Sequence, residues 1–190
     1  LALSCSAATV DYGVSGLENP LLYLLLVGGL VAAGRVPMLA QIVFAGLLVT
    51  AVGLTRMDAL VLAGPPLLVM AYGLQPRKMA LRALITASLP FVLWEVFSLG
   101  YYGSLVPNTA IAKLNLGIPW LELVAQGGRY LAWSARRDPM TLALIAGGMA
   151  AAAARGGRVE RASAVGLALY LLYILRIGGD FMGGRFLAAP

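Results

Sequence analysis

Six apolar segments, rich in Leu, Ala, Val and Gly, follow one another along this chain of 190 residues. Hydrophobic residues make up 61% of the chain and charged residues only 12%, whereas soluble domains carry about 25% charged residues. The segments are too continuous for the short alternating strands of a membrane β-barrel. The sequence therefore predicts an all-α, polytopic membrane protein with about six transmembrane helices. The predicted spans are Pro20–Ala33, Met38–Leu54, Ala59–Gly73, Ala83–Gly100, Thr141–Ala154 and Ala162–Ile177.

Two of these spans contain residues that a membrane helix rarely carries. The pair Pro65-Pro66 is expected to kink its helix or to end the first half of it, because proline removes a backbone donor. Glu95 lies inside an apolar run, where a carboxylate costs roughly 2.5–3.5 kcal/mol unless it faces a partner or a cavity. Glu95 has two explanations. It pairs with Arg176 or with a hydroxyl of another helix, or it binds a ligand.

The distribution of basic residues predicts the orientation of the spans. The loops after the first, third and fifth spans are short and almost purely basic, which is typical of a cytoplasmic face. Their charged residues are Arg35, Arg77, Lys78, Arg82, Arg155, Arg158 and Arg161, against the single acid Glu160. The remaining polar stretches then share the periplasmic face. The connection 101–140 lies there too, and its aromatic residues Trp120, Tyr130 and Trp133 predict an interfacial helix.

Composition also excludes several kinds of chemistry. The chain has no histidine and a single cysteine, Cys5, so it offers no His-based metal site, no Ser-His-Asp triad and no internal disulfide. The net charge of +6 is a topology signal, and no basic run with interleaved aromatics indicates a nucleic-acid surface. The chain begins at Leu1 without a signal-peptide pattern, and we expect residues 1–190 to be a fragment of a longer protein.

Two polar turns on the predicted periplasmic face carry charges. In "TRMD", Arg56 and Asp58 either anchor helix ends or place a guanidinium and a carboxylate toward a shared cavity. In "SGLENP", Ser15 or Asn19 is expected to cap a helix, with Pro20 at its first position. Capping leaves Glu18 unexplained, and its carboxylate suits a sugar hydroxyl.

Two longer stretches are more distinctive. In "YYGSLVPNTAIAKL", Asn108 lies at the start of a short predicted helix that carries Lys113, either a snorkelling lysine or a phosphate contact. In "GGDFMGGRF", the glycines permit positive φ and close approach of a ligand. Its arginine, Arg185, offers a planar fork for a phosphate, and Asp180 either pairs with it on the surface or shares its ligand.

Together these stretches place acids and cations on one face, above the predicted bundle. This arrangement suits a lipid-linked, phosphate-bearing substrate whose polar head reacts outside the membrane. A transporter or flippase is the main alternative, but it would place polar groups near the midplane of the membrane. A scaffold whose charges only anchor helices is a further alternative.

In this order, "SGLENPLL", an Arg-x-Asp turn, "YYGSLVPNTAIAKL" and "GGDFMGGRF" resemble bacterial GT-C glycosyltransferases that use polyprenyl-phosphate sugars. The resemblance is greatest to the terminal β-(1→2) arabinofuranosyltransferase group, and it extends from Ser15 to Pro190. The family's turn usually reads Arg-Pro-Asp-Gly. Here it is Arg56-Met57-Asp58-Ala59, which keeps the charges and loses the turn formers.

The resemblance implies inverting transfer of a sugar from a polyprenyl phosphate to a glycan or lipid acceptor of the cell envelope, at the periplasmic face of the inner membrane. It implies that Lys113 and Arg185 hold the donor phosphate. It implies that sugar hydroxyls are oriented by Glu18, Asp58, Asn108 and Asp180. The catalytic base is expected on an acidic residue upstream of Leu1. GT-C relatives allow a divalent metal, but the chain presents no cofactor signature of its own.

Overall fold

The computed structural model describes residues 5–29, 31, 35, 38–72, 76–105, 117–180 and 182–188. These residues form helices and no strands, so the all-α prediction is confirmed for the described part of the chain. The elements are α1 (Ala7–Gly13), α2 (Asn19–Tyr23), the π-helical η2 (Leu24–Gly28), α4 (Met38–Thr55), the 3₁₀ turn η3 (Met57–Ala59), α5 (Leu60–Tyr72), α6 (Arg77–Tyr102), α8 (Trp120–Arg137), α9 (Pro139–Arg155), α10 (Arg158–Ile177) and the 3₁₀ turn η4 (Phe186–Ala188).

The helices coincide with the predicted apolar segments, but of the two expectations for Pro65-Pro66 the end of the helix is wrong. Helix α5 continues through Pro65 and Pro66 to Tyr72, so the pair does not end it. Pro66 is buried together with Leu62 and Leu67. We attribute the continuity to this packing, because tertiary burial routinely overrides a poor helix propensity.

Only α6, among the described residues, is long and apolar enough to cross a membrane by length and composition. Four other apolar helices in the described ranges are shorter, with 10–17 residues. A typical hydrocarbon core needs about 20 residues of helix. The prediction of six spans therefore remains a prediction.

Helix α10 lies at the centre of the fold and packs against α5, α8 and α9. Its buried positions include Gly166, Tyr170 and Ile174, which are spaced four apart and therefore share one helical face. A Cβ at Gly166 would lie 2.3 Å from the backbone oxygen of Leu62. The contact between α5 and α10 thus depends on a residue without a side chain.

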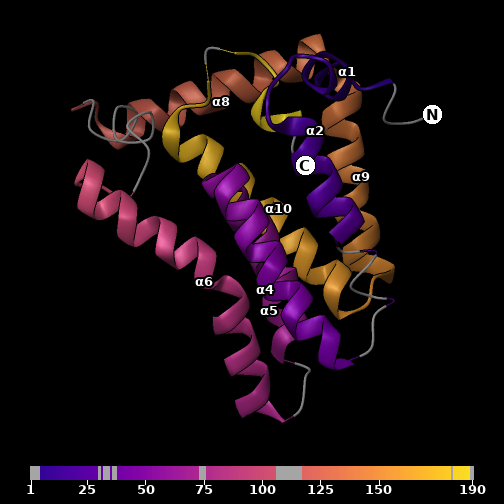
Figure 1. Cartoon of the computed structure of the whole chain (residues 1–190). Coiled ribbons are helices and arrows are strands. Elements are labelled where there is room, and N and C mark those ends of the chain that lie inside the picture. Colours follow the sequence, from indigo (N-terminus) through magenta and orange to yellow (C-terminus); the bar gives the residue numbers. More distant parts are fainter. Residues whose placement is uncertain are drawn as a thin grey trace.

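Helix α6 packs on α4 along only part of its length. The hydroxyl of Thr50 in α4 donates a hydrogen bond to the carbonyl of Ala87 (2.9 Å), and Gly53 lies against the ring of Phe91. Beyond this contact α6 bends away from the other helices (Figure 1). Its last turns expose large side chains, including Phe97 and Tyr101.

Helix α8 lies across one end of the other helices, where α1 and the segment after α10 are also found (Figure 1). It is amphipathic, because Leu123, Gly127, Tyr130 and Ser134 are buried along one face. Trp120 and Trp133 on the same helix are exposed, as expected for an interfacial helix. Tyr130 is not at such an interface, because it is buried against the protein.

Candidate functional site

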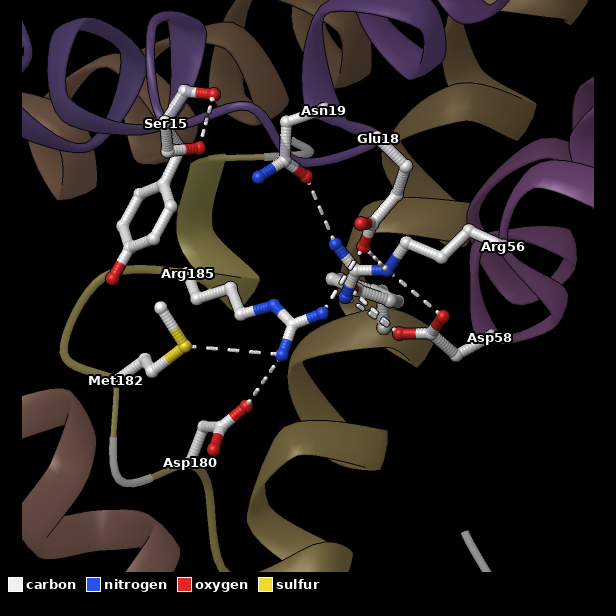
Figure 2. A network of polar contacts seen from close by, with 10 residues as sticks. Ser15, Glu18, Asn19, Arg56, Asp58, Asp180, Met182 and Arg185 are labelled. Carbon is white, nitrogen blue, oxygen red and sulfur yellow. Dashed lines mark hydrogen bonds and ion pairs between the residues drawn. The ribbon is translucent and has the colours of Figure 1, made fainter. Parts of the chain in front are cut away.

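Polar side chains from four separate parts of the sequence meet at the end of the helices that carries α8 (Figure 2). They come from the start of α2, the turn between α4 and α5, the middle of α10 and the loop after α10. We call this group the polar cluster. Its members are Glu18, Asn19, Arg56, Asp58, Tyr170, Asp180 and Arg185.

The buried half of the cluster, which comprises Asn19, Arg56, Asp58 and Tyr170, is built around one arginine. The side chain of Arg56 is only 8% exposed. It donates from Nε to Asp58 Oδ1 (3.0 Å) and from Nη2 to Asp58 Oδ2 (2.8 Å). This is a bidentate ion pair, which balances the charge of the arginine and also fixes the orientation of its guanidinium.

Asn19 and Tyr170 accept two further hydrogen bonds from this guanidinium. Arg56 donates from Nη1 to Asn19 Oδ1 (3.2 Å) and from Nη2 to Tyr170 Oη (2.9 Å). The Tyr170 hydroxyl in turn donates to Asp58 Oδ2 (3.1 Å). A buried charge is tolerated when it is paired and hydrogen-bonded in this way.

The surroundings of Arg56 keep it charged. Burial by itself lowers the pKa of this guanidinium, but the hydrogen bond to Asp58 and the charges nearby raise it above the usual value. The ring of Phe186 also covers the guanidinium, with its centroid 5.2 Å from Cζ, a distance at which the ring face attracts a cation. Arg56 is therefore a permanent positive charge enclosed by protein.

The prediction that Asn19 or Ser15 caps α2 is wrong. Neither side chain caps this helix: Asn19 binds Arg56, and the Ser15 hydroxyl donates to the Tyr12 carbonyl (3.1 Å). Asn19 binds Arg56 instead of capping the helix because its side chain is fully buried, and a buried amide needs a hydrogen-bond partner.

The accessible half of the cluster consists of Asp180, whose side chain is buried, and the partly exposed pair Glu18 and Arg185. The side chains of this pair are 26% and 27% exposed, and Arg185 Nη2 donates to Glu18 Oε1 (3.2 Å). On its other side Arg185 Nη1 lies 3.7 Å from Asp180 Oδ2, and the Asp180 side chain is only 1% exposed. Glu18 also lies 3.9 Å from Arg56 Nε, so it joins the two halves.

Two of the four glycines in the loop after α10 accommodate aromatic side chains of α8. A Cβ at Gly179 would lie 2.6 Å from Tyr130, and one at Gly183 would lie 2.0 Å from Trp133. Gly179 has a positive φ of +78°, which favours glycine. Part of the space that the sequence assigned to a ligand is thus filled by α8. Burial raises the pKa of Tyr130 to about 12, so its phenol stays neutral.

The structure brings together five of the seven predicted site residues: Glu18, Arg56, Asp58, Asp180 and Arg185. Asn108 and Lys113 lie outside the described residues. Sequence reasoning missed Tyr170 and Phe186, and missed the role of Asn19. A tyrosine inside an apolar helix is itself a signal, because its hydroxyl needs a partner when buried.

Glu95 does not belong to the cluster by any contact among the described residues. It is half-buried in α6, and its Oε1 has no hydrogen-bond partner in the described part of the chain. The choice between a structural pair and a ligand role therefore stays open for this carboxylate.

The residues present do not fit a metal ion. No group of three or more His, Cys, Asp or Glu side chains is placed to hold one within the ranges that the structure describes. Asp58, Glu18 and Asp180 each lie against an arginine, which competes for the same carboxylate oxygens.

Fold and site together define an apolar, all-helical protein with a charged cluster at one end, in which one arginine stays accessible. Two curated relatives match the chain. It is 33% identical over 211 aligned residues to the terminal β-(1→2)-arabinofuranosyltransferase of Mycobacterium tuberculosis, covering 95% of this chain and 34% of that protein. It is 32% identical over 134 residues to the protein of the same name from Corynebacterium glutamicum, covering 60% of this chain and 19% of that protein.

Over 95% of its length the chain is similar to a terminal β-(1→2)-arabinofuranosyltransferase, and it spans about a third of the length of that mycobacterial relative. The resemblance noted in the sequence is thereby confirmed. No protein family profile matches the chain, and no solved structure does.

Proposed function

We propose that this chain carries part of the donor site of a GT-C type membrane glycosyltransferase. The enzyme transfers arabinofuranose, with inversion, from a polyprenyl phosphate to a cell-envelope glycan or lipid on the periplasmic face. The names of the two relatives support the sugar and the reaction class. The observation that carries the proposal is the partly exposed Arg185, held between two carboxylates, close to a buried arginine that is paired with Asp58.

Arg185 is the residue of this cluster best suited to the donor phosphate. Its guanidinium presents a planar fork of N–H groups, which matches two phosphate oxygens. Asp180 lies behind it with a buried side chain and fixes its direction. As the phosphate leaves, negative charge builds up on its oxygens, and a positioned cation stabilises that charge.

Glu18 is placed to bind the sugar rather than the phosphate. Its carboxylate is accessible and accepts from Arg185. When a phosphate takes over Arg185, the carboxylate becomes free to accept from a sugar hydroxyl. Asp58 is already held by Arg56 and Tyr170. We therefore assign it to positioning the site, and we keep Lys113 and Asn108 as further donor contacts.

The test is transfer by the full-length protein in membrane vesicles, from polyprenyl-phosphoryl arabinofuranose to an arabinofuranosyl acceptor. Arg185→Lys keeps the charge and removes the fork, and we expect turnover to fall by about 100-fold, the scale of losing one oxyanion donor. Asp180→Asn should weaken transfer less. Arg155→Lys, at the exposed end of α9, is the matched control and should be silent.

Unchanged turnover in Arg185→Lys and Asp180→Asn would favour a scaffold whose charges only anchor helices. Movement of the intact lipid-linked sugar across the vesicle, without any new glycosidic bond, would favour a flippase. Either result rejects the proposed function.

A further inference from the structure

A hollow of about 280 Å³ lies between α8 and the loop after α10. Its walls are Gln126, Arg129, Tyr130 and Trp133 on α8, facing Asp180 and Gly183 on the loop. This volume is close to the lower limit for small-molecule pockets, which start at about 300 Å³. The hollow therefore suits a short ligand, such as one or two sugar units.

Trp133 forms a partition between this hollow and a smaller one. The smaller hollow is lined by Arg137 and Asp138 as well as by Trp133, and Arg137 does not line the larger one. The guanidinium of Arg137 lies 5.5 Å from the centre of the Trp133 ring. Arg137 therefore covers the indole from the side of the smaller hollow, which leaves the side toward the larger hollow open.

The orientation of this indole is fixed by the opposite wall. A Cβ at Gly183 would lie 2.0 Å from Trp133 Cζ3, so the ring edge rests on bare backbone. The side chain is nevertheless 47% exposed. A rigid, half-exposed ring that is held by its edge provides a flat apolar surface at little entropic cost.

The polar groups of the hollow favour a neutral ligand with many hydroxyls over an anion. Gln126 offers both a donor and an acceptor, and Arg129 offers donors; both are exposed. Asp180 lies in the opposite wall with its carboxylate directed at Arg185, and its negative charge balances the positive charge of Arg129, so the lining carries no net charge that selects an anion. A sugar presents C–H groups on one face, which pack on an aromatic ring, and hydroxyls around its rim.

We propose that this hollow binds the acceptor saccharide, with Trp133 stacking on one sugar ring while Gln126 and Arg129 bind its hydroxyls. The inference rests on the proposed function, because it names the acceptor side of the same site. Asp180 connects the two parts: it lines the hollow and contacts Arg185 of the polar cluster. Acceptor and donor would therefore meet at this residue.

The experiment measures initial transfer rates of the full-length protein as a function of an arabinofuranosyl disaccharide acceptor, at fixed donor. Trp133→Ala should raise the acceptor KM about tenfold and leave the donor KM unchanged, and Trp133→Phe should lie in between. Trp120→Ala is the matched control, because Trp120 is an exposed tryptophan on the same helix that does not line the hollow. It should change neither constant.

Gln126→Ala and Arg129→Ala keep the test decisive if Trp133→Ala does not fold, because both side chains are exposed. Each should raise the acceptor KM several-fold. A wild-type acceptor KM in the folded Trp133 and Gln126 variants would overturn the inference, and so would inorganic phosphate that competes with the disaccharide at this hollow.

Equilibrium binding of the same disaccharide without donor separates this inference from the proposed function. Binding that depends on Trp133 in a protein that transfers no sugar would reject the proposed function and support the saccharide site. Transfer that is insensitive to Trp133 would reject the saccharide site alone.

Discussion

Each half of the polar cluster contains an arginine paired with a carboxylate, but one pair is buried and the other is partly exposed to solvent. Arg56 and Asp58 are enclosed, and all three nitrogens of the Arg56 guanidinium donate to protein acceptors, with a ring over its face. Arg185 and Glu18 form a single hydrogen bond at about a quarter exposure. The difference separates positioning from binding: the first arginine is buried and donates to three protein side chains, whereas the second is partly exposed and can reach a ligand.

The largest expected effect comes from breaking the buried half. Arg56→Ala leaves Asp58 as a buried charge without its main partner, which typically costs about 3–5 kcal/mol of folding stability. The measurement is the unfolding free energy in detergent micelles. A variant as stable as the wild type would mean that Asp58 is hydrated and that the two halves do not differ.

A paired replacement sharpens this result. Arg56→Met combined with Asp58→Leu removes both charges, and such apolar replacements are often neutral or stabilising. We expect the double variant to recover most of the stability that Arg56→Ala loses, while transfer activity stays low because Glu18 loses its neighbour. Recovery of both properties would contradict a positioning role for this pair.

A smaller effect is expected from Tyr170→Phe. It removes the hydroxyl that accepts from Arg56 and donates to Asp58, and a hydrogen bond to a charged group contributes about 1.5–3 kcal/mol. Thermal unfolding of the variant measures this loss. Tyr173→Phe in the same helix is the matched control, and an equal loss there would show that the cluster is not the cause.

The smallest effect is expected in the accessible half. A double-mutant cycle of Glu18→Gln and Arg185→Gln should give a coupling energy of about 0–1 kcal/mol. Salt should weaken it, because the Debye length falls from about 10 Å at 0.1 M to about 3 Å at 1 M. A coupling above about 3 kcal/mol that salt leaves unchanged would erase the distinction between the halves.

The helices were largely predictable because each follows a long apolar run, and Met38–Thr55 differs from the predicted span by one residue at its end. Charged residues on the predicted face also pointed to Arg56, Asp58 and Arg185. Tyr170 and Asn19 were not predictable in the same way. Their roles depend on α10 and α2 lying beside the turn at Arg56, and sequence periodicity does not record which helices are neighbours.

The glycine-rich loop after α10 also shows what sequence alone does not predict. Its glycine content predicted backbone conformations with positive φ, and Gly178, Gly179 and Gly184 do adopt positive φ. The sequence could not indicate that Tyr130 and Trp133, some fifty residues earlier, would pack against two of its glycines. That contact depends on how α8 crosses α10, which is a property of the packed structure.

Arg185 and Phe186 are neighbours in the chain that serve different halves of the cluster. Arg185 pairs with Glu18, while the Phe186 ring shields the guanidinium of Arg56. Because one peptide bond joins the two residues, a substitution that shifts the backbone here would disturb the Glu18–Arg185 contact and the cover of Arg56 together.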